Sequence, residues 1–411
     1  MKTKLFILLS ILTISFSCKN ERNTDNKTNS NTPYLVMLSL DGFRWDYPEK
    51  ANTPNFDYIE EIGVRADAII PCFPTKTFPN HYSMATGLYP DNHGIILNSF
   101  YAPDIDKNYA IRNKKAVLNP DFYFGEPIWV TAEKQGIKSA SYFWVGSETN
   151  HEGILPSYHY AYKGSVPFEE RLDGVIKWLK LPKNERPHLV LWYIQEPDSK
   201  GHEVGPNHPE LISMVEYLDS IVGAFNKKIA NLAIADKVNI IITSDHGMGE
   251  ISKDRTVYLF DLFDKKWCEH IDGGNPAYSI DVKDEYYDTV YNALSSNENI
   301  TVWKKENAPE RLHYGSSIRV KDFIVVADSS WSLLKSSNQK AYSGGTHGYD
   351  NKNTDMHAIF YAYGPAFKNN YKHHSINNID IYPLICNILN LKPAKIDGDL
   401  QNAKGMLLNK E

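Results

Sequence analysis

The sequence contains little cysteine, no excess of basic residues and no internal repeat. Its 411 residues include only four cysteines, and their wide spacing matches neither a disulfide framework nor a CxxC metal site. Cys72, Cys268 and Cys386 are interpreted as buried apolar residues, with one disulfide as the alternative. The net charge of −6, without a basic stripe, argues against a nucleic-acid-binding surface. What remains is a globular chain with 42% hydrophobic residues, enough for one large core.

The N-terminus resembles a targeting segment. Two early lysines are followed by an apolar run from Leu5 to Phe16, which is short for a membrane span and typical of a signal-peptide core. Cys18 after Ser17 predicts a bacterial lipoprotein signal at residues 1–18, although Ser15 stands where an aliphatic residue is usual and ordinary cleavage is the alternative. Residues 19–32 predict a flexible tether. We therefore expect an exported protein of the cell envelope, anchored through lipid on Cys18, with its main domain at residues 33–411.

Strand-like runs alternate with helical patterns along the main domain. Apolar runs predict strands at residues 34–40, 139–144, 188–194, 238–243 and 357–362. Helical patterns occupy residues 55–62, 168–181, 209–230 and 379–391. This order predicts an α/β fold with a mostly parallel central sheet and helices on both faces. Shorter, more polar segments at about residues 255–341 predict a smaller inserted subdomain.

Carboxylates and imidazoles recur where these strands end. A lone Asp at a strand end is most often a cap or turn residue, but that does not explain three Asp and three His in such positions. The residues are Asp41, Asp198, His202, Asp245, His246 and His347. Because ligands bind outside the carboxyl ends of parallel strands, we expect one shared site. Six good zinc ligands divide into two groups of three and predict two Zn²⁺ ions, with residual positive charge that attracts an anion.

A threonine precedes a helix that is predicted to begin near Asn80, within the stretch FPTKTFPNHYSMATG. Its hydroxyl is either a helix cap or a nucleophile that faces an anion, because the N–H groups of a helix N-terminus favour negative charge. Coordination to Zn²⁺ would lower the pKa of this hydroxyl, so Thr77 is the candidate nucleophile. Lys76 is interpreted either as a phosphate contact or as a solvated surface residue, and His81 as structural.

Seven motifs resemble, in order, the nucleotide pyrophosphatase/phosphodiesterase family of the alkaline phosphatase superfamily. They are LSLDGFRWDY, PTKTFPNHYSMATGLYPDNHGI, FWVGSE, GSVPFEER, EPDSKGH, TSDHGM and GTHGYDN. The resemblance covers roughly residues 33–403 and implies that Thr77 is the nucleophile. It implies one zinc ion held by Asp41, Thr77, Asp245 and His246. The other zinc ion would be held by Asp198, His202 and His347.

The same resemblance implies how substrate is bound. Asn98 would contact a phosphoryl oxygen, and Phe78 and Tyr193 match positions that sandwich a nucleobase. A further tyrosine of the family falls near residues 158–160, and the register places His159 at that wall of the pocket, which departs from the family pattern.

The resulting expectation is a monomeric two-zinc phosphodiesterase or pyrophosphatase. It would cleave nucleotide substrates through a covalent Thr77 intermediate and release nucleoside monophosphate. The nearest alternative is a phosphodiesterase acting on phosphocholine or glycerophosphodiesters. A phosphomonoesterase is disfavoured because the motifs show no well-placed arginine. A non-catalytic surface lipoprotein is disfavoured because Thr77 and every expected ligand are present.

Overall fold

The computed structural model describes residues 32–408, so the predicted signal peptide and the lipid site at Cys18 lie outside the described residues. An eight-stranded sheet forms the centre of the molecule, and seven of its strands share one direction while β18 is reversed. The strand order is β19 (Tyr371–His373), β2 (Val64–Ala66), β18 (Phe360–Tyr363), β9 (Val238–Thr243), β1 (Tyr34–Leu40), β8 (Leu189–Ile194), β6 (Ser139–Tyr142) and β7 (Tyr158–Tyr160). The predicted mostly parallel sheet is confirmed.

Helices cover both faces of this sheet, because successive side chains of a strand point to opposite faces. In β1, Leu35 and Met37 belong to one core cluster, and Val36 and Leu38 belong to the other. The first cluster packs against α3 (Thr77–Thr86), α6 (Ile128–Lys134) and α12 (Ile381–Leu389). The second packs against α2 (Pro54–Ile62), α7 (Phe168–Leu179) and α9 (Pro209–Ala230).

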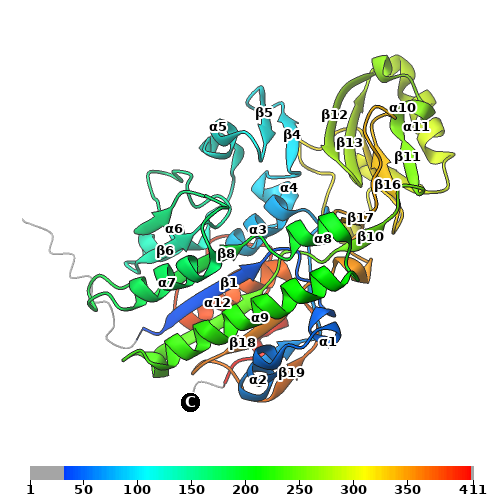
Figure 1. The fold of residues 1–411 in the computed structure, drawn as a ribbon. Helices are drawn as coiled ribbons and strands as arrows, with labels where there is room; N and C mark the ends of the chain where they lie inside the picture. The colour runs from blue at the N-terminus through cyan, green and yellow to red at the C-terminus, as the bar shows by residue number, and fades with distance from the viewer. Residues whose placement is uncertain (1–31, 409–411) are drawn as a thin grey trace, which may run out of the picture.

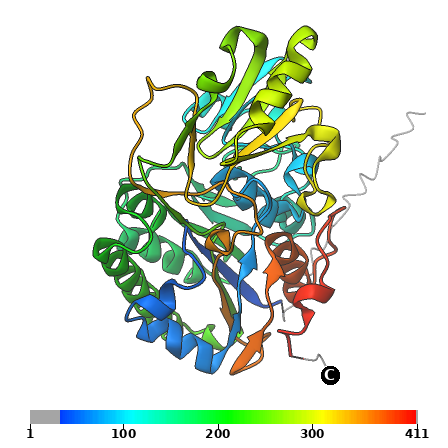
Figure 2. The same ribbon diagram turned by 90° about the vertical axis from the view of Figure 1, so that its right-hand side faces the viewer.

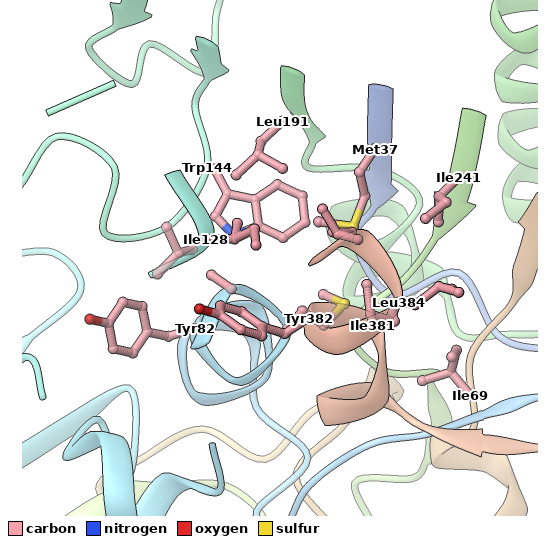
Figure 3. Close-up of a cluster of buried hydrophobic side chains, with 14 of the residues drawn as sticks. Met37, Ile69, Tyr82, Ile128, Trp144, Leu191, Ile241, Ile381, Tyr382 and Leu384 are labelled. Atoms are coloured by element: carbon pink, nitrogen blue, oxygen red, sulfur yellow. The ribbon is translucent and has the colours of Figure 1, made fainter. Parts of the chain in front are cut away.

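The first core cluster lies directly beneath the strands that carry the site. Figure 3 shows Met37, Leu191 and Ile241 pointing from three neighbouring strands toward Ile381 and Leu384 of α12. Tyr82 of α3 belongs to the same cluster and is completely buried. Packing of this kind is dense and resists displacement, so it fixes α3 against the sheet.

A second, smaller sheet lies apart from the central one, at the upper right of Figure 1 and at the top of Figure 2. Its antiparallel order is β12 (Cys268–Gly274), β13 (Ala277–Val282), β15 (Phe323–Ala327) and β14 (Ile300–Lys304). It has its own core, to which α11 (Tyr287–Ser295) contributes Val290 and Leu294. This sheet falls within the insertion predicted at about residues 255–341, whose boundaries stay a prediction.

Short elements connect the two sheets and surround the site. The strand pairs are β3 (Ile69–Ile70) with β20 (Ile376–Asn377), β4 (Ser99–Ala102) with β5 (Lys107–Ala110), β10 (Gly249–Ile251) with β17 (Gly344–Thr346), and β11 (Thr256–Tyr258) with β16 (Ser332–Leu334). The remaining α-helices are α1 (Tyr47–Lys50), α4 (Pro90–His93), α5 (Lys114–Val117), α8 (Asp198–Val204), α10 (Leu259–Leu262) and α13 (Gln401–Lys404). Among the helices of residues 32–408, none has both the length and the hydrophobicity needed to cross a bilayer.

Several element ends differ from the sequence-based expectation. The strand expected at residues 139–144 ends at Tyr142, because Phe143 adopts a left-handed backbone with φ of 73°. Helix α3 begins at Thr77 rather than near Asn80, and the Asn80 amide already bonds to the Lys76 carbonyl at 3.1 Å. The last predicted helix ends at Leu389, where Asn390 turns left-handed with φ of 55°. Cys72, Cys268 and Cys386 are all unpaired.

Candidate active site

The strand ends bring the six predicted metal ligands into one cluster. Asp41 follows β1, Asp245 and His246 follow β9, and Asp198 begins α8 just beyond β8. Since β8, β1 and β9 are adjacent and parallel, their carboxyl ends meet at one edge of the sheet. His347 follows β17, which packs beside α8 and so reaches the same edge.

The first predicted group is tightly packed and buried. His246 Nε2 lies 3.0 Å from Asp245 Oδ2 and 3.4 Å from Asp41 Oδ1. Thr77 Oγ1 lies 3.2 Å from the same His246 nitrogen. Thr77 is the first residue of α3, and its hydroxyl contacts His246, so it faces the cluster rather than capping the helix.

The second predicted group centres on Asp198. Its Oδ1 atom lies 3.4 Å from His202 Nε2 and 3.6 Å from His347 Nε2. The two groups are contiguous, because the His246 and His347 rings stack with their centroids 3.6 Å apart. Asp198, His246 and His347 also offer ligand atoms within 4.8 Å of one another, so His246 can reach either group.

All three histidines present the same nitrogen to the cluster. Each Nδ1 donates to a backbone carbonyl, from His202 to Gly345 at 2.9 Å, from His246 to Gly247 at 2.8 Å, and from His347 to Thr75 at 2.8 Å. Because a carbonyl only accepts, the hydrogen of a neutral imidazole lies on Nδ1 and the lone pair on Nε2. This arrangement is typical of histidines that bind a metal.

Three carboxylate oxygens of the cluster face imidazole nitrogens without a well-aligned hydrogen bond. Within residues 32–408, no hydrogen-bond donor is aligned with the buried atoms Asp41 Oδ1, Asp198 Oδ1 and Asp245 Oδ2, although histidine nitrogens lie 3.0 to 3.6 Å from them. Burial and then the neighbouring Asp245 and Asp198 raise the pKa of Asp41 well above its usual value. Burial also acts against ionised Asp245, but His246 and His81 hold the pKa of that carboxyl well below its usual value. Three facing oxygens and three free imidazole lone pairs fit divalent cations.

Side chains behind the ligands fix their orientation. The Tyr193 hydroxyl donates to Asp41 Oδ2 at 2.6 Å, which leaves Oδ1 for the cluster. His81 Nδ1 lies 3.2 Å from Asp245 Oδ2 and 3.0 Å from the Thr77 carbonyl, and neither of these can donate. His81 therefore carries hydrogen on Nδ1, and Ser39 can donate to its Nε2 at 2.9 Å. His81, which the sequence analysis interprets as structural, thus contacts the candidate ligand Asp245 and the backbone of the candidate nucleophile Thr77.

Asn98 lies against the start of α3. The Phe78 amide donates to Asn98 Oδ1 at 3.1 Å. This contact occupies the amide oxygen and leaves the Nδ2 hydrogens of Asn98 as donors beside Thr77.

A cavity of about 550 Å³ opens from the cluster, with Asp41, Thr77 and Asp198 at one end. Its walls include the rings of Phe78, Tyr162 and Tyr193. His159, expected at this wall, does not line the cavity; it is exposed on the edge strand β7, paired with Ser141. Tyr162, three residues further on, takes that place, because the chain leaves β7 before it reaches the cavity.

Two basic residues of the cavity were missed from the sequence. Arg112 and Lys114 line its wall, and within residues 32–408 neither side chain has an ion pair or a hydrogen-bond partner. The sequence-based expectation concerned the motifs, and Arg112 lies outside all of them. The Ile111 amide bonds to the Asn98 carbonyl at 3.0 Å, so the β4–β5 hairpin returns the chain to the site. The sequence of residues 111–114 contains no motif that predicts their position at the site.

Lys76 is neither solvated nor directed at a phosphate position. Its side chain is buried, and Nζ donates to the carbonyls of His347 and Asn275, each at 2.6 Å. Burial lowers the pKa of Lys76 to about 7, partly offset by Asp198.

Fold and site together define a class of protein. An alkaline-phosphatase-like α/β sheet carries Asp and His side chains that fit divalent cations, with a hydroxyl at a helix start beside them, which is the arrangement of metal-assisted phosphoryl transfer. The chain belongs to the type I phosphodiesterase/nucleotide pyrophosphatase family, whose model matches residues 35–350.

Relatives of the chain include enzymes and solved structures. It is 39% identical over 392 residues to human ectonucleotide pyrophosphatase/phosphodiesterase family member 1, covering 92% of this chain and 42% of that protein. It is 38% identical over 387 residues to a venom phosphodiesterase of Macrovipera lebetinus, covering 91% of this chain and 45% of the venom protein. The chain thus spans less than half the length of these two relatives. The structure of an inactive variant of murine ectonucleotide pyrophosphatase/phosphodiesterase 5 in complex with AMP superposes with a TM-score of 0.87 at 36% identity, covering 92% of this chain and all of that one.

Proposed function

We propose that the protein is a two-zinc phosphodiesterase and pyrophosphatase that acts on nucleotides. One ion would be held by Asp41, Thr77, Asp245 and His246. The other would be held by Asp198, His202 and His347. The observation that carries this proposal is the set of buried carboxylate oxygens, without an aligned donor in residues 32–408, that face histidine Nε2 atoms beside the Thr77 hydroxyl.

Thr77 is the proposed nucleophile. Bound divalent cations would lower the pKa of its hydroxyl and offset the charge of a phosphate. Thr77 Oγ1 forms a bond to phosphorus while the bond to the leaving oxygen breaks. A water molecule then attacks the same phosphorus, the Thr77 ester bond breaks, and nucleoside monophosphate is released. One water is consumed, and its hydrogen atoms are shared between the two products.

Neighbouring residues would bind and orient the substrate. Asn98 Nδ2 is available to donate to a phosphoryl oxygen, because its Oδ1 already accepts from the Phe78 amide. Phe78 and Tyr162, together with Tyr193, offer rings on which a flat base can stack. The AMP complex of the murine relative supports a nucleotide in the corresponding cavity.

Charge in the cavity argues against the phosphocholine alternative. A trimethylammonium group would enter a cavity whose wall carries Arg112 and Lys114, for which the described part of the chain provides no counter-ion. Glu148 lines the same cavity and accepts from the Tyr162 amide through Oε1 at 2.8 Å, and its single negative charge is outnumbered by the two cations. Base edges and phosphates, which accept hydrogen bonds, suit these two cations better.

We also propose that the enzyme works outside the cytoplasm as a monomer anchored through Cys18. This part rests on the N-terminal sequence, and it agrees with the family names of the relatives, which describe ectoenzymes and venom proteins.

The test combines metal analysis with a comparison of three p-nitrophenyl substrates. We expect two zinc ions per chain, and faster turnover of the thymidine monophosphate ester than of the phosphocholine ester or of p-nitrophenyl phosphate. Active protein with one ion or none would overturn the two-metal site. Preference for the phosphocholine ester would overturn the nucleotide assignment alone.

A further inference from the structure

Lys76 occupies an unusual position for a lysine, directly before the proposed nucleophile. It is 8% exposed, and no carboxylate of residues 32–408 lies within ion-pair distance of its ammonium group. Its hydrogen-bond partners are two backbone carbonyls, those of His347 and Asn275. Burying an ammonium group with only carbonyls as partners costs free energy, and here the bonds to these carbonyls join two distant segments of the chain.

Residues 75 and 76 are bonded to the His347 segment at four points. His347 Nδ1 donates to the Thr75 carbonyl at 2.8 Å, and Lys76 Nζ donates to the His347 carbonyl at 2.6 Å. The Thr75 hydroxyl accepts from the Gly348 amide at 2.9 Å and donates to the Tyr349 carbonyl at 3.0 Å. These contacts fix both the ring of His347 and the backbone that carries it.

Gly348 completes the contact with Lys76. Its φ of 119° is unfavourable for other residues, and a Cβ atom there would overlap the end of the Lys76 side chain. The lysine therefore lies directly on the backbone of the His347 segment.

The second carbonyl connects Lys76 to the small sheet. Asn275 lies in the turn between β12 and β13, and its Oδ1 accepts from the Leu333 amide of β16 at 2.8 Å. Asn275 Nδ2 donates to Ser332 Oγ at 3.3 Å. The turn whose carbonyl accepts from Lys76 is thus part of the small sheet and is also hydrogen-bonded to β16.

We propose that Thr75 and Lys76 are positioning residues that hold His347 in place for the second metal ion, with the small sheet as their outer support through Asn275. Thr77 follows directly in the chain, so the same contacts set the nucleophile and His347 relative to each other. This inference rests on the metal site of the proposed function.

The experiment measures metal binding rather than activity of the loaded enzyme. Metal-free protein is titrated with Zn²⁺ by calorimetry and with Co²⁺ by visible absorption, and His347→Ala identifies the binding step that belongs to the second group. Lys76→Met keeps the apolar stem but removes the donors. We expect it to weaken that step about 10- to 100-fold and to change the Co²⁺ bands, while the other step is unaffected.

Lys321→Met is the matched control. Lys321 is also a buried lysine that donates to a carbonyl, that of Tyr101 at 3.2 Å, but it contacts β4 and lies 3.8 Å from two carboxylates, those of Asp272 and Asp281. We expect this variant to lower the melting temperature and to leave both binding steps unchanged. If Lys76→Met does not fold, Thr75→Val tests the inference instead, because it loses only the hydroxyl contacts. We again expect weaker metal binding in the step that belongs to the second group.

Two results would overturn the inference in distinguishable ways. Wild-type protein that binds two ions, together with unchanged constants in folded Lys76→Met or in Thr75→Val, would refute the positioning role and leave the proposed function intact. Wild-type protein that binds no divalent ion would refute the proposed function, and this inference with it.

Discussion

The two halves of the candidate metal cluster are supported in different ways. Asp41, Asp245 and His246 form an inner group that comes from the ends of the adjacent strands β1 and β9, and the side chains of Asp245 and His246 are 0% exposed. Asp198, His202 and His347 form an outer group from the short helix α8 and the segment after β17, and the His202 side chain is 35% exposed.

Their supports differ as well. Side chains of the core orient the inner carboxylates, with Tyr193 on Asp41 and His81 on Asp245. The outer histidines, like His246, are held by backbone carbonyls, and the segment that carries His347 is bonded in addition to Thr75 and Lys76. The inner group is therefore tied to the central sheet by core side chains, whereas the outer group comes from segments that pack beside that sheet and are held mainly by backbone contacts.

The largest effect is expected at Thr77, whose hydroxyl lies beside His246 in the cluster. Thr77→Ala should lower turnover of a diester by several orders of magnitude, because the attacking hydroxyl is removed. Thr77→Ser should keep a measurable fraction of activity. Steady-state kinetics with the thymidine monophosphate ester measures both variants, with zinc content as the control for intact sites. A near wild-type rate in Thr77→Ala would mean that water attacks directly.

The second prediction tests whether the outer group loses its ion separately from the inner group. Asp198→Ala or His347→Ala should each remove one ion and nearly all activity but leave a folded protein, because the outer group lies outside the packed core. Dialysis of wild-type protein against increasing chelator should remove this ion first. Elemental analysis with circular dichroism at each step provides the measurement. Simultaneous loss of both ions would show that the two groups do not differ in affinity.

The third prediction separates substrate contacts from ligand support. Stacking of a base on an aromatic ring contributes roughly 1–3 kcal/mol, so Phe78→Ala or Tyr162→Ala should lower kcat/KM for the thymidine monophosphate ester roughly 5- to 150-fold. Turnover of a base-free ester should change far less, and zinc content should not change. His159→Ala is the matched control, since His159 is exposed on β7 and outside the cavity. Equal losses with both esters would contradict base stacking.

The smallest effect is expected at Tyr193, where ring and hydroxyl have separate tasks. Tyr193→Phe removes the 2.6 Å bond to Asp41 Oδ2 but keeps the ring in the cavity wall. Inner-ion affinity should fall about tenfold, at the lower end of the range for such support, while the preference for the nucleotide ester persists. Metal titration alongside kinetics with both esters checks this. An unchanged inner-ion affinity would show that the hydroxyl contact is dispensable for Asp41.

The sequence alone was sufficient for the fold class and for the residues of the cluster. Strands β1 and β9 and helix α9 have the predicted bounds, because continuous apolar runs and long amphipathic patterns are local properties of the chain. The candidate ligands were recognisable because Asp and His recur at strand ends, and parallel topology brings strand ends together. Their assignment to two separate ions stays a prediction, since His246 lies within reach of both groups.

Only the tertiary structure decided which residues surround the ligands. Tyr162 rather than His159 lines the cavity, Arg112 reaches it through a hairpin, and Lys76 is buried between two carbonyls. Each of these outcomes depends on contacts between segments far apart in the chain, as with Lys76 and Asn275, 199 residues apart. Local patterns specify what a segment forms and which face it buries. The approach of two distant segments is set by the packing of the whole core, which no short stretch of sequence contains.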